Sequence, residues 1–160
     1  MILKGNTAMK KITSFTVDHT KMTEGMYISR IDGDITTYDL RMRIPNGGDY
    51  ISPSAMHTME HMFATYIRNS DIADDVIYFG PMGCQTGFYL LIRNADHVRV
   101  FEEVKKVINL IKDSKGPVFG NSEVECGNYR TLNLGLAHYE AERYARVLEA
   151  FTDMTFSYQQ

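Results

Sequence analysis

The chain has 160 residues, 44% of them hydrophobic and 23% charged, and a formal net charge of −3 at pH 7. This length and composition are typical of one soluble globular domain with its own hydrophobic core. The weak charge gives no reason to expect nucleic acid or an anionic membrane as a partner, and no apolar stretch reaches the length of a transmembrane helix. Two cysteines, Cys84 and Cys126, are expected as free thiols or ligands rather than as a disulfide.

Residues 1–12 are interpreted as a flexible N-terminal extension of a single domain that spans residues 1–160. The segment from Met1 to Thr13 contains lysines but no long apolar run. It is therefore not a secretory signal, and a cytoplasmic location is the default. The extension is longer than the domain needs, which makes Met9 a candidate start.

A β-hairpin is predicted first along the chain. Residues 26–31 and 35–44 are predicted as strands, because apolar and β-branched residues there flank Asp32-Gly33-Asp34, a turn signal. The glycine-rich segment 45–49 is predicted as a loop.

A helix is predicted next, from Ser52 to about Asn69. Ser52 can cap its N-terminus, and Pro53 suits the first helical position. Much of its apolar surface should come from Met59, Met62, Phe63, Tyr66 and Ile67.

Two strands and two helices are predicted in the rest of the chain. Residues 76–79 and 88–92 are short apolar runs around a glycine-rich loop, 80–87. Residues 98–112 and 134–151 carry apolar side chains at helical spacing. Because strands and helices mix without a regular βαβ alternation, we predict an α+β fold in which a mostly antiparallel sheet packs with about three main helices.

His57 and His61 form the first candidate site. Residues four apart on a helix share one face, so both imidazoles can bind one metal ion. Glu60 lies on the same face, and the order His-x-x-Glu-His also occurs in a class of zinc peptidases. Glu60 could be a general base, a metal ligand or a solvated carboxylate; its place beside two histidines favours a proton shuttle.

A third ligand would complete a site with one open coordination position, which is typical of catalytic metal sites. The segment 119–128, predicted as irregular, offers Glu123, Glu125 and Cys126. A glutamate would match the peptidases, whereas a thiolate would give a more electron-rich ion. Spacing alone does not choose between them, but the pattern predicts a small metalloenzyme.

Cys84 is the second unusual residue, because it lies in a loop between Gly83 and Gly87. Small neighbours let backbone and substrate approach closely. A loop cysteine beside a cation can serve as a general acid/base, and an inert thiol is the alternative.

Together these segments resemble the S-ribosylhomocysteine lyase family, LuxS, from about residue 14 to residue 150. Five pieces in matching order carry the resemblance: Ser14-Phe15-Thr16-Val17-Asp18-His19-Thr20; Tyr38-Asp39-Leu40-Arg41 followed by Pro45-Asn46; His57-Thr58-Met59-Glu60-His61; Pro81-Met82-Gly83-Cys84-Gln85-Thr86-Gly87-Phe88-Tyr89; and Glu125-Cys126-Gly127.

The resemblance implies a carbon–sulfur lyase that cleaves S-ribosylhomocysteine to homocysteine and 4,5-dihydroxy-2,3-pentanedione, the precursor of the quorum-sensing signal autoinducer-2, by two carbonyl migrations and a β-elimination. One divalent metal per subunit, Fe²⁺ with Zn²⁺ or Co²⁺ as substitutes, would be bound by His57, His61 and Cys126. Cys84 and Glu60 would act as general acid/base. The enzyme would belong to the methyl cycle.

The resemblance also implies a homodimer with two active sites at the interface. Ser14, His19 and Arg41 would contribute to the site of the neighbouring subunit, where Arg41 would steady anionic species. Arg68, at the end of the metal-binding helix, could meet the substrate carboxylate, or it could be a cation favoured by the helix dipole.

Some positions depart from the usual family pattern. The loop before Cys84 usually reads acidic-x-Ser-Pro-Met-Gly-Cys, but here Tyr78 and Gly80 replace the acidic residue and the serine. Tyr78 cannot supply a charge to the substrate ammonium group. Arg43 stands where a small or apolar residue is usual, and its guanidinium would either act on the site or point to solvent.

Two alternative functions stay open at this point. A zinc metallopeptidase with the inverted motif would need a glutamate ligand and a larger, usually two-lobed chain, and it would leave Cys84 without a task. A catalytically silent LuxS-like binding protein would share the fold without turnover, and the departures at Tyr78 and Arg43 are compatible with it.

Overall fold

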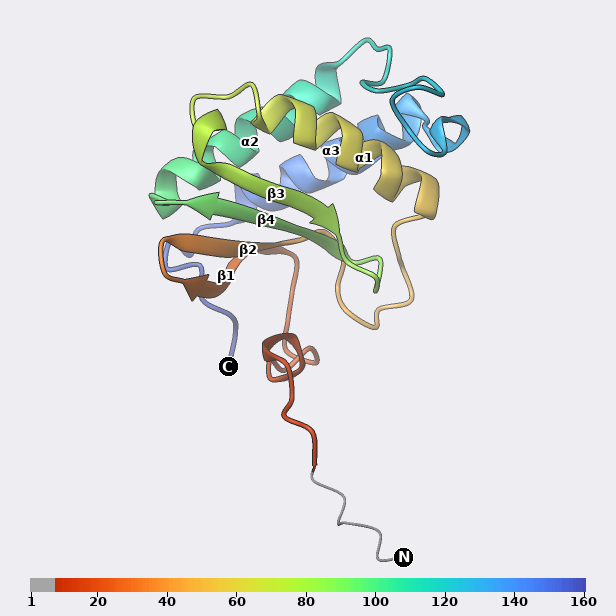
Figure 1. The fold of residues 1–160 in the computed structure, drawn as a ribbon. Coiled ribbons are helices and arrows are strands. Elements are labelled where there is room, and N and C mark those ends of the chain that lie inside the picture. Colours follow the sequence, from red (N-terminus) through yellow and green to blue (C-terminus); the bar gives the residue numbers. More distant parts are fainter. Residues whose placement is uncertain (1–7) are drawn as a thin grey trace, which may run out of the picture.

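An antiparallel sheet covered on one face by helices forms the body of the protein, as the computed structural model of residues 8–160 shows (Figure 1). The sheet has the order β1-β2-β4-β3. Its strands are β1 (Gly25–Asp32), β2 (Ile35–Arg41), β3 (Val76–Pro81) and β4 (Gly87–Arg93). The helices are α1 (Pro53–Ile67), α2 (His97–Asp113) and α3 (Leu134–Ala150), and the 3₁₀ turns are η1 (Thr13–Phe15), η2 (Ala73–Asp75) and η3 (Tyr129–Thr131).

The predicted α+β class is thereby confirmed. None of the helices within residues 8–160 is long and apolar enough to cross a membrane. The part of the expected N-terminal extension that covers residues 1–7 lies outside the described residues.

The sheet alternates between a core face and an outer face. Tyr38 and Leu40 of β2 pair with Leu90 and Phe88 of β4, and all four are fully buried against the helices. Because strand residues alternate in direction, polar side chains of β2 such as Asp39 belong to the opposite face. Asp39 and Arg41 of β2 therefore lie on the face of the sheet without helices.

Two strand boundaries differ from the prediction. β2 ends at Arg41 rather than at residue 44, because the N–H groups of Met42 and Arg43 both donate to the carbonyl of Thr86, at 2.9 and 3.0 Å, instead of continuing the ladder. β3 continues to Pro81, which pairs with Phe88, so the predicted loop 80–87 shortens to 82–86.

The first helix begins as predicted. Ser52 caps α1, and its Oγ accepts a hydrogen bond from the N–H of Ala55 at 3.2 Å. Four of the five apolar side chains assigned to this helix are fully buried, and the fifth, Tyr66, is half-buried. Since the buried side faces the sheet and α3, the other side of the helix is free to carry polar groups.

Arg43 is buried in an ion pair. Its Nη2 lies 2.7 Å from Oε1 of Glu140 on α3, and both side chains are at most 5% exposed. Nη1 donates to the carbonyl of Met42 at 3.1 Å, and Nε lies 3.4 Å from Asp49. The alternative in which Arg43 points to solvent is wrong, because its buried guanidinium ties the end of β2 to α3.

Replacing Arg43 with methionine should lower the free energy of unfolding by roughly 3–5 kcal/mol, because the variant leaves the Glu140 carboxylate buried without its cation. Urea unfolding at one protein concentration, followed by circular dichroism, measures this loss. The double variant Arg43→Met, Glu140→Leu is the matched control and should recover most of it, since an apolar pair carries no desolvation cost. Equal stability of the single variant and the unmodified chain would contradict the prediction.

Candidate metal centre and acid–base cluster

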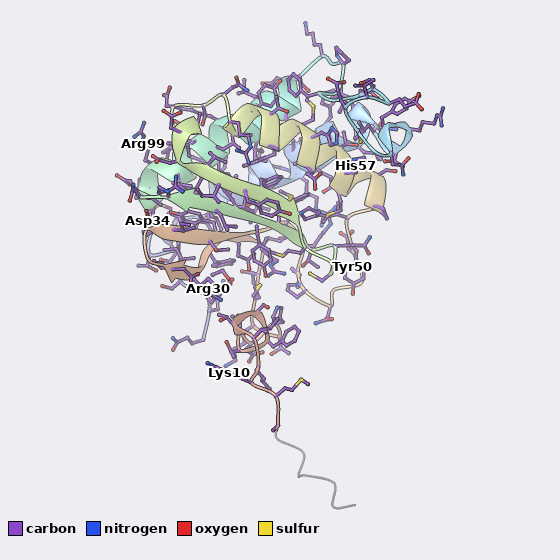
Figure 2. The ribbon with its side chains drawn as sticks, viewed as in Figure 1. Lys10, Arg30, Asp34, Tyr50, His57 and Arg99 are labelled. Atoms are coloured by element: carbon purple, nitrogen blue, oxygen red, sulfur yellow. The ribbon has the colours of Figure 1, made fainter. Side chains whose placement is uncertain are left out.

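Three side chains converge beside the N-terminal half of α1, where Figure 2 labels His57. His57 and His61 lie one turn apart on α1, and Cys126 comes from the segment before η3. One ligand atom from each lies within 4.8 Å of the others, and Cys126 Sγ is 3.4 Å from His57 Nε2. A nitrogen and a sulfur donor bound to one tetrahedral zinc-sized ion lie roughly 3.5 Å apart. The three residues therefore fit a divalent transition metal.

Cys126 takes the place of third donor that spacing left open. Ser122 Oγ donates to the carboxylate of Glu125, and Glu123 is exposed. Within residues 8–160 the group has three members, so an ion there would keep a position for water or substrate. Both cysteines are free, and the disulfide does not form.

The Nδ1 atoms of His57 and His61 both have hydrogen-bond partners. His61 Nδ1 donates to the carbonyl of Phe119 at 2.8 Å, and His57 Nδ1 lies 2.6 Å from Thr131 Oγ1. Gly120 makes the first contact possible, because it has a φ of +69° and a Cβ there would lie 3.0 Å from the His61 ring. Such outer contacts orient metal-binding histidines. Sequence reasoning missed them, because the partners lie 58 and 74 residues away.

The ionisation of His57 suits a ligand. Burial lowers its pKa most, the neighbouring His61 lowers it further, and the charge of Glu60 acts in the opposite direction. The neutral imidazole, which is the form that binds a metal, therefore predominates at neutral pH. Glu60 itself is half-buried on α1 between the two histidines.

Cys84 belongs to a cluster with a buried cation. Its Sγ lies 3.9 Å from Arg41 Nη1 and 3.0 Å from Thr86 Oγ1. Arg41 Nη1 also donates to Thr86 Oγ1 at 2.7 Å. Cys84 is an exposed residue whereas Arg41 is 2% exposed, so a buried guanidinium lies beside the sulfur of an exposed loop residue.

Arg41 is held in this place by the C-terminal segment and by its own strand. Its Nε and Nη2 donate to the two carboxylate oxygens of Asp39 at 3.0 and 2.6 Å. The Tyr158 hydroxyl donates to the same carboxylate at 2.7 Å. Burial alone would lower the pKa of Arg41, but the Asp39 carboxylate and its neighbours raise that pKa overall. The cation beside Cys84 is therefore permanent.

A family model for S-ribosylhomocysteinase (LuxS) matches residues 12–154. The chain belongs to the LuxS family. Three relatives named S-ribosylhomocysteine lyase align with 94% of this chain and 99% of their own length. They come from Borreliella afzelii (42% identical), Desulfotalea psychrophila (43%) and Clostridium acetobutylicum (40%). These matches favour neither the metallopeptidase nor the silent binding protein.

Two departures from the LuxS pattern are linked in space. The hydroxyl of Tyr78 lies over Gly80, at a place that a Cβ on residue 80 would occupy. A serine there would overlap the tyrosine ring. The glycine therefore leaves room for the tyrosine in the orientation that it takes here.

Ser14 and His19 belong to an N-terminal segment that lies on the side of the sheet away from the helices (Figure 1). Two members of the triad of His57, His61 and Cys126 lie instead on α1. Ser14 lines a hollow of about 420 Å³ with Tyr78 and Tyr89. His19 contacts the carbonyl of Val17 through Nδ1 at 2.9 Å.

Arg68 lies at the C-terminal end of α1, seven residues after His61. At 1.5 Å of rise per residue this is roughly 10 Å along the helix axis. Its guanidinium donates to the carbonyls of Val76 and Ile77 at 3.5 and 3.3 Å. These two backbone contacts hold the Arg68 guanidinium in place. Its contact with the substrate stays a prediction.

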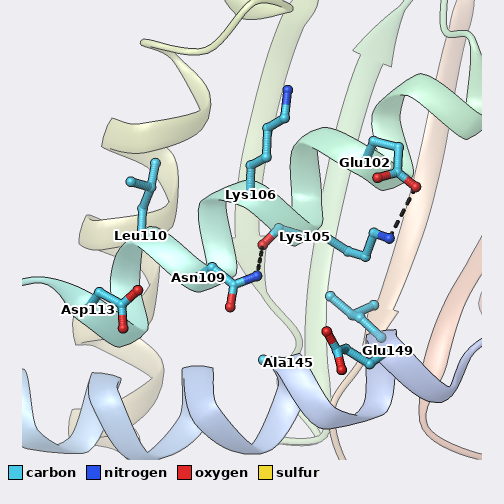
Figure 3. Close-up of a pocket in the computed structure, with 9 residues that line it drawn as sticks. Glu102, Lys105, Lys106, Asn109, Leu110, Asp113, Ala145 and Glu149 are labelled. Carbon is cyan, nitrogen blue, oxygen red and sulfur yellow. Dashed lines mark hydrogen bonds and ion pairs between the residues drawn. The ribbon is translucent and has the colours of Figure 1, made fainter.

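A hollow of about 530 Å³ between α2 and α3 is unrelated to the triad (Figure 3). Two of its charged groups, Lys105 and Glu102, form an ion pair at 3.1 Å. Asn109 donates to the carbonyl of Lys105 at 2.9 Å. The ligands of the candidate metal centre come from α1 and the segment before η3, so this hollow lies outside it.

Proposed function

We propose that the chain cleaves S-ribosylhomocysteine to homocysteine and 4,5-dihydroxy-2,3-pentanedione. The observation that carries the proposal is the open three-donor group of His57, His61 and Cys126 in a chain of the LuxS family. An inverted-motif peptidase would use a glutamate where Cys126 lies.

Membership of the LuxS family favours Fe²⁺ as the ion, and Zn²⁺ or Co²⁺ would suit the same nitrogen and sulfur ligands. His57, His61 and Cys126 would hold one ion per subunit. When bound, a divalent ion supplies Lewis-acid stabilisation of the negative charge that each proton removal leaves on the sugar oxygens.

The substrate determines what the protein must do. A thioether bond breaks easily when the carbon next to a ketone loses a proton and the following carbon carries the sulfur. The sulfur then leaves as a thiolate. The open-chain sugar carries its aldehyde on the first carbon and its sulfur on the fifth. The carbonyl must therefore move twice, to the third carbon, before loss of the proton on the fourth carbon expels the thiolate.

Cys84 and Glu60 are the groups that we assign to these proton transfers. Each isomerisation takes a proton from one carbon and returns one to its neighbour, which requires a base that then acts as an acid. Cys84 is exposed on a loop with its sulfur beside Arg41. Arg41 would stabilise the anionic sulfur, and Thr86 would orient it through its hydroxyl.

The working unit that we propose is a cytoplasmic homodimer without nucleic-acid or membrane partners. Ser14 and His19 of the N-terminal segment would reach the site of the neighbouring subunit, and Arg41 would border the same interface. Arg68 would meet the substrate carboxylate. Sedimentation of a monomer at assay concentrations would contradict the shared site.

An anaerobic assay of the ferrous protein on S-ribosylhomocysteine tests the function, with the released thiol detected by a disulfide dye. We expect thiol release in proportion to the iron bound. Metal-replete protein that releases no thiol would overturn the lyase assignment. Cleavage of casein by the same sample would favour the peptidase instead.

A further inference from the structure

Thr131 makes the shortest contact that the structure records for a candidate metal ligand among residues 8–160. Its Oγ1 lies 2.6 Å from Nδ1 of His57, and both side chains are half-buried. Thr131 belongs to η3, which follows Cys126 by only a few residues. The contact therefore connects the segment that carries the thiolate with the helix that carries the imidazoles.

The hydrogen bonds of the Thr131 hydroxyl indicate which ring nitrogen of His57 carries the proton. The Thr131 hydroxyl donates to the carbonyl of Asn128 at 3.1 Å. With its one proton used, Oγ1 accepts from Nδ1–H of His57. The lone pair of this imidazole is then on Nε2, which faces Cys126 Sγ at 3.4 Å. This arrangement of donors and acceptors would hold His57 in the tautomer that a metal needs.

Two further contacts fix the position of this segment. The N–H of Asn133 donates to Thr58 Oγ1 at 2.9 Å, so the chain after Thr131 is anchored on the helix residue next to His57. The N–H of Asn128 donates to Cys126 Sγ at 3.5 Å. The same short turn therefore contacts two of the three candidate ligands.

We propose that Thr131 is a positioning residue of the metal centre, which sets the tautomer and the ring orientation of His57 through its hydroxyl. The proposal rests on the metal site of the proposed function and adds a residue to it. Loss of such an outer contact typically weakens metal affinity roughly 10–100-fold. The hydroxyl matters, rather than the bulk of the side chain.

Thr131→Val tests this with almost unchanged volume, and Thr131→Ser is the matched control because it keeps the hydroxyl. Affinity for Co²⁺ is measured by competition with a chelator. We expect a loss of roughly 10–100-fold in the valine variant and little change in the serine variant. The absorption bands of bound Co²⁺, which report ligand geometry, should shift only in the valine variant.

A second measurement needs no metal. Nitrogen-15 NMR of histidine-labelled, metal-free protein at mildly alkaline pH reports which ring nitrogen carries the proton. His57 should be protonated on Nδ1 in the unmodified chain and in Thr131→Ser, and should become a mixture in Thr131→Val.

The outcomes separate this inference from the function. A proton on Nε2 of His57 in the unmodified chain, or equal Co²⁺ affinity of the valine and serine variants, would overturn the role of Thr131. Absence of Co²⁺ or Fe²⁺ binding by the unmodified chain would instead overturn the metal site, and the tautomer would still be measured.

Discussion

Replacing Cys126 with alanine should abolish metal binding and, with it, thiol release from S-ribosylhomocysteine. The variant loses the sulfur that lies 3.4 Å from His57 Nε2, and with it the donor that brings negative charge to two neutral imidazoles. Two neutral nitrogen donors on one helix turn bind a divalent ion far more weakly than three donors that include a thiolate. Elemental analysis should show about one ion per subunit in the unmodified protein and close to none in the variant.

Thermal unfolding provides the control for folding. A ligand present at 100 times its Kd stabilises the folded state by about 2.7 kcal/mol, so a chelator should lower the Tm of the unmodified protein. The Tm of Cys126→Ala should not respond to the chelator, and it should resemble that of the chelated parent. Full metal occupancy in Cys126→Ala would remove this residue from the centre.

Replacing Cys84 with serine should leave metal content unchanged and reduce turnover by roughly 10²–10⁴-fold, which is the usual contribution of a positioned acid or base. Serine fills nearly the same space and can keep the contact with Thr86. It does not ionise near neutral pH, so the charge of Arg41 has no anion to stabilise. Steady-state release of homocysteine, compared at equal iron content, measures the loss.

Thr86→Val is a graded comparison for the same cluster. It removes the hydroxyl that lies 3.0 Å from Cys84 Sγ and accepts from Arg41, but it retains the thiol. Its rate should fall between those of the unmodified chain and Cys84→Ser. If Cys84→Ser released homocysteine at the normal rate, the acid/base role of this cysteine would be wrong.

Local sequence signals predicted much of the fold. α1 follows from a serine cap, a proline at the first turn and apolar residues at helical spacing, because these act within one or two turns. The β1–β2 hairpin follows from its turn residues for the same reason. β2 ended earlier than predicted because Thr86, from a distant loop, takes the hydrogen bonds of Met42 and Arg43. No local signal reports such a competitor.

Part of the candidate site likewise follows from local sequence signals, and part depends on distant segments. His57, His61 and Glu60 follow from spacing on one helix, whereas the placement of Cys126 rather than Glu123 or Glu125 beside them depends on how the segment after α2 folds back. The fate of Arg43 likewise depended on Glu140, 97 residues away.

By itself, the order of residues determined the helix that presents two imidazoles, the glycine-rich loop that exposes Cys84, and the family to which both belong. Only the tertiary structure shows Cys126, rather than Glu123 or Glu125, grouped with the imidazoles, the Arg41 guanidinium beside the Cys84 sulfur, and the Thr131 hydroxyl beside His57. Secondary structure arises from interactions between near neighbours in the chain, which a pattern of residue types records. A ligand set and its hydrogen-bond partners are assembled from segments that only packing brings together.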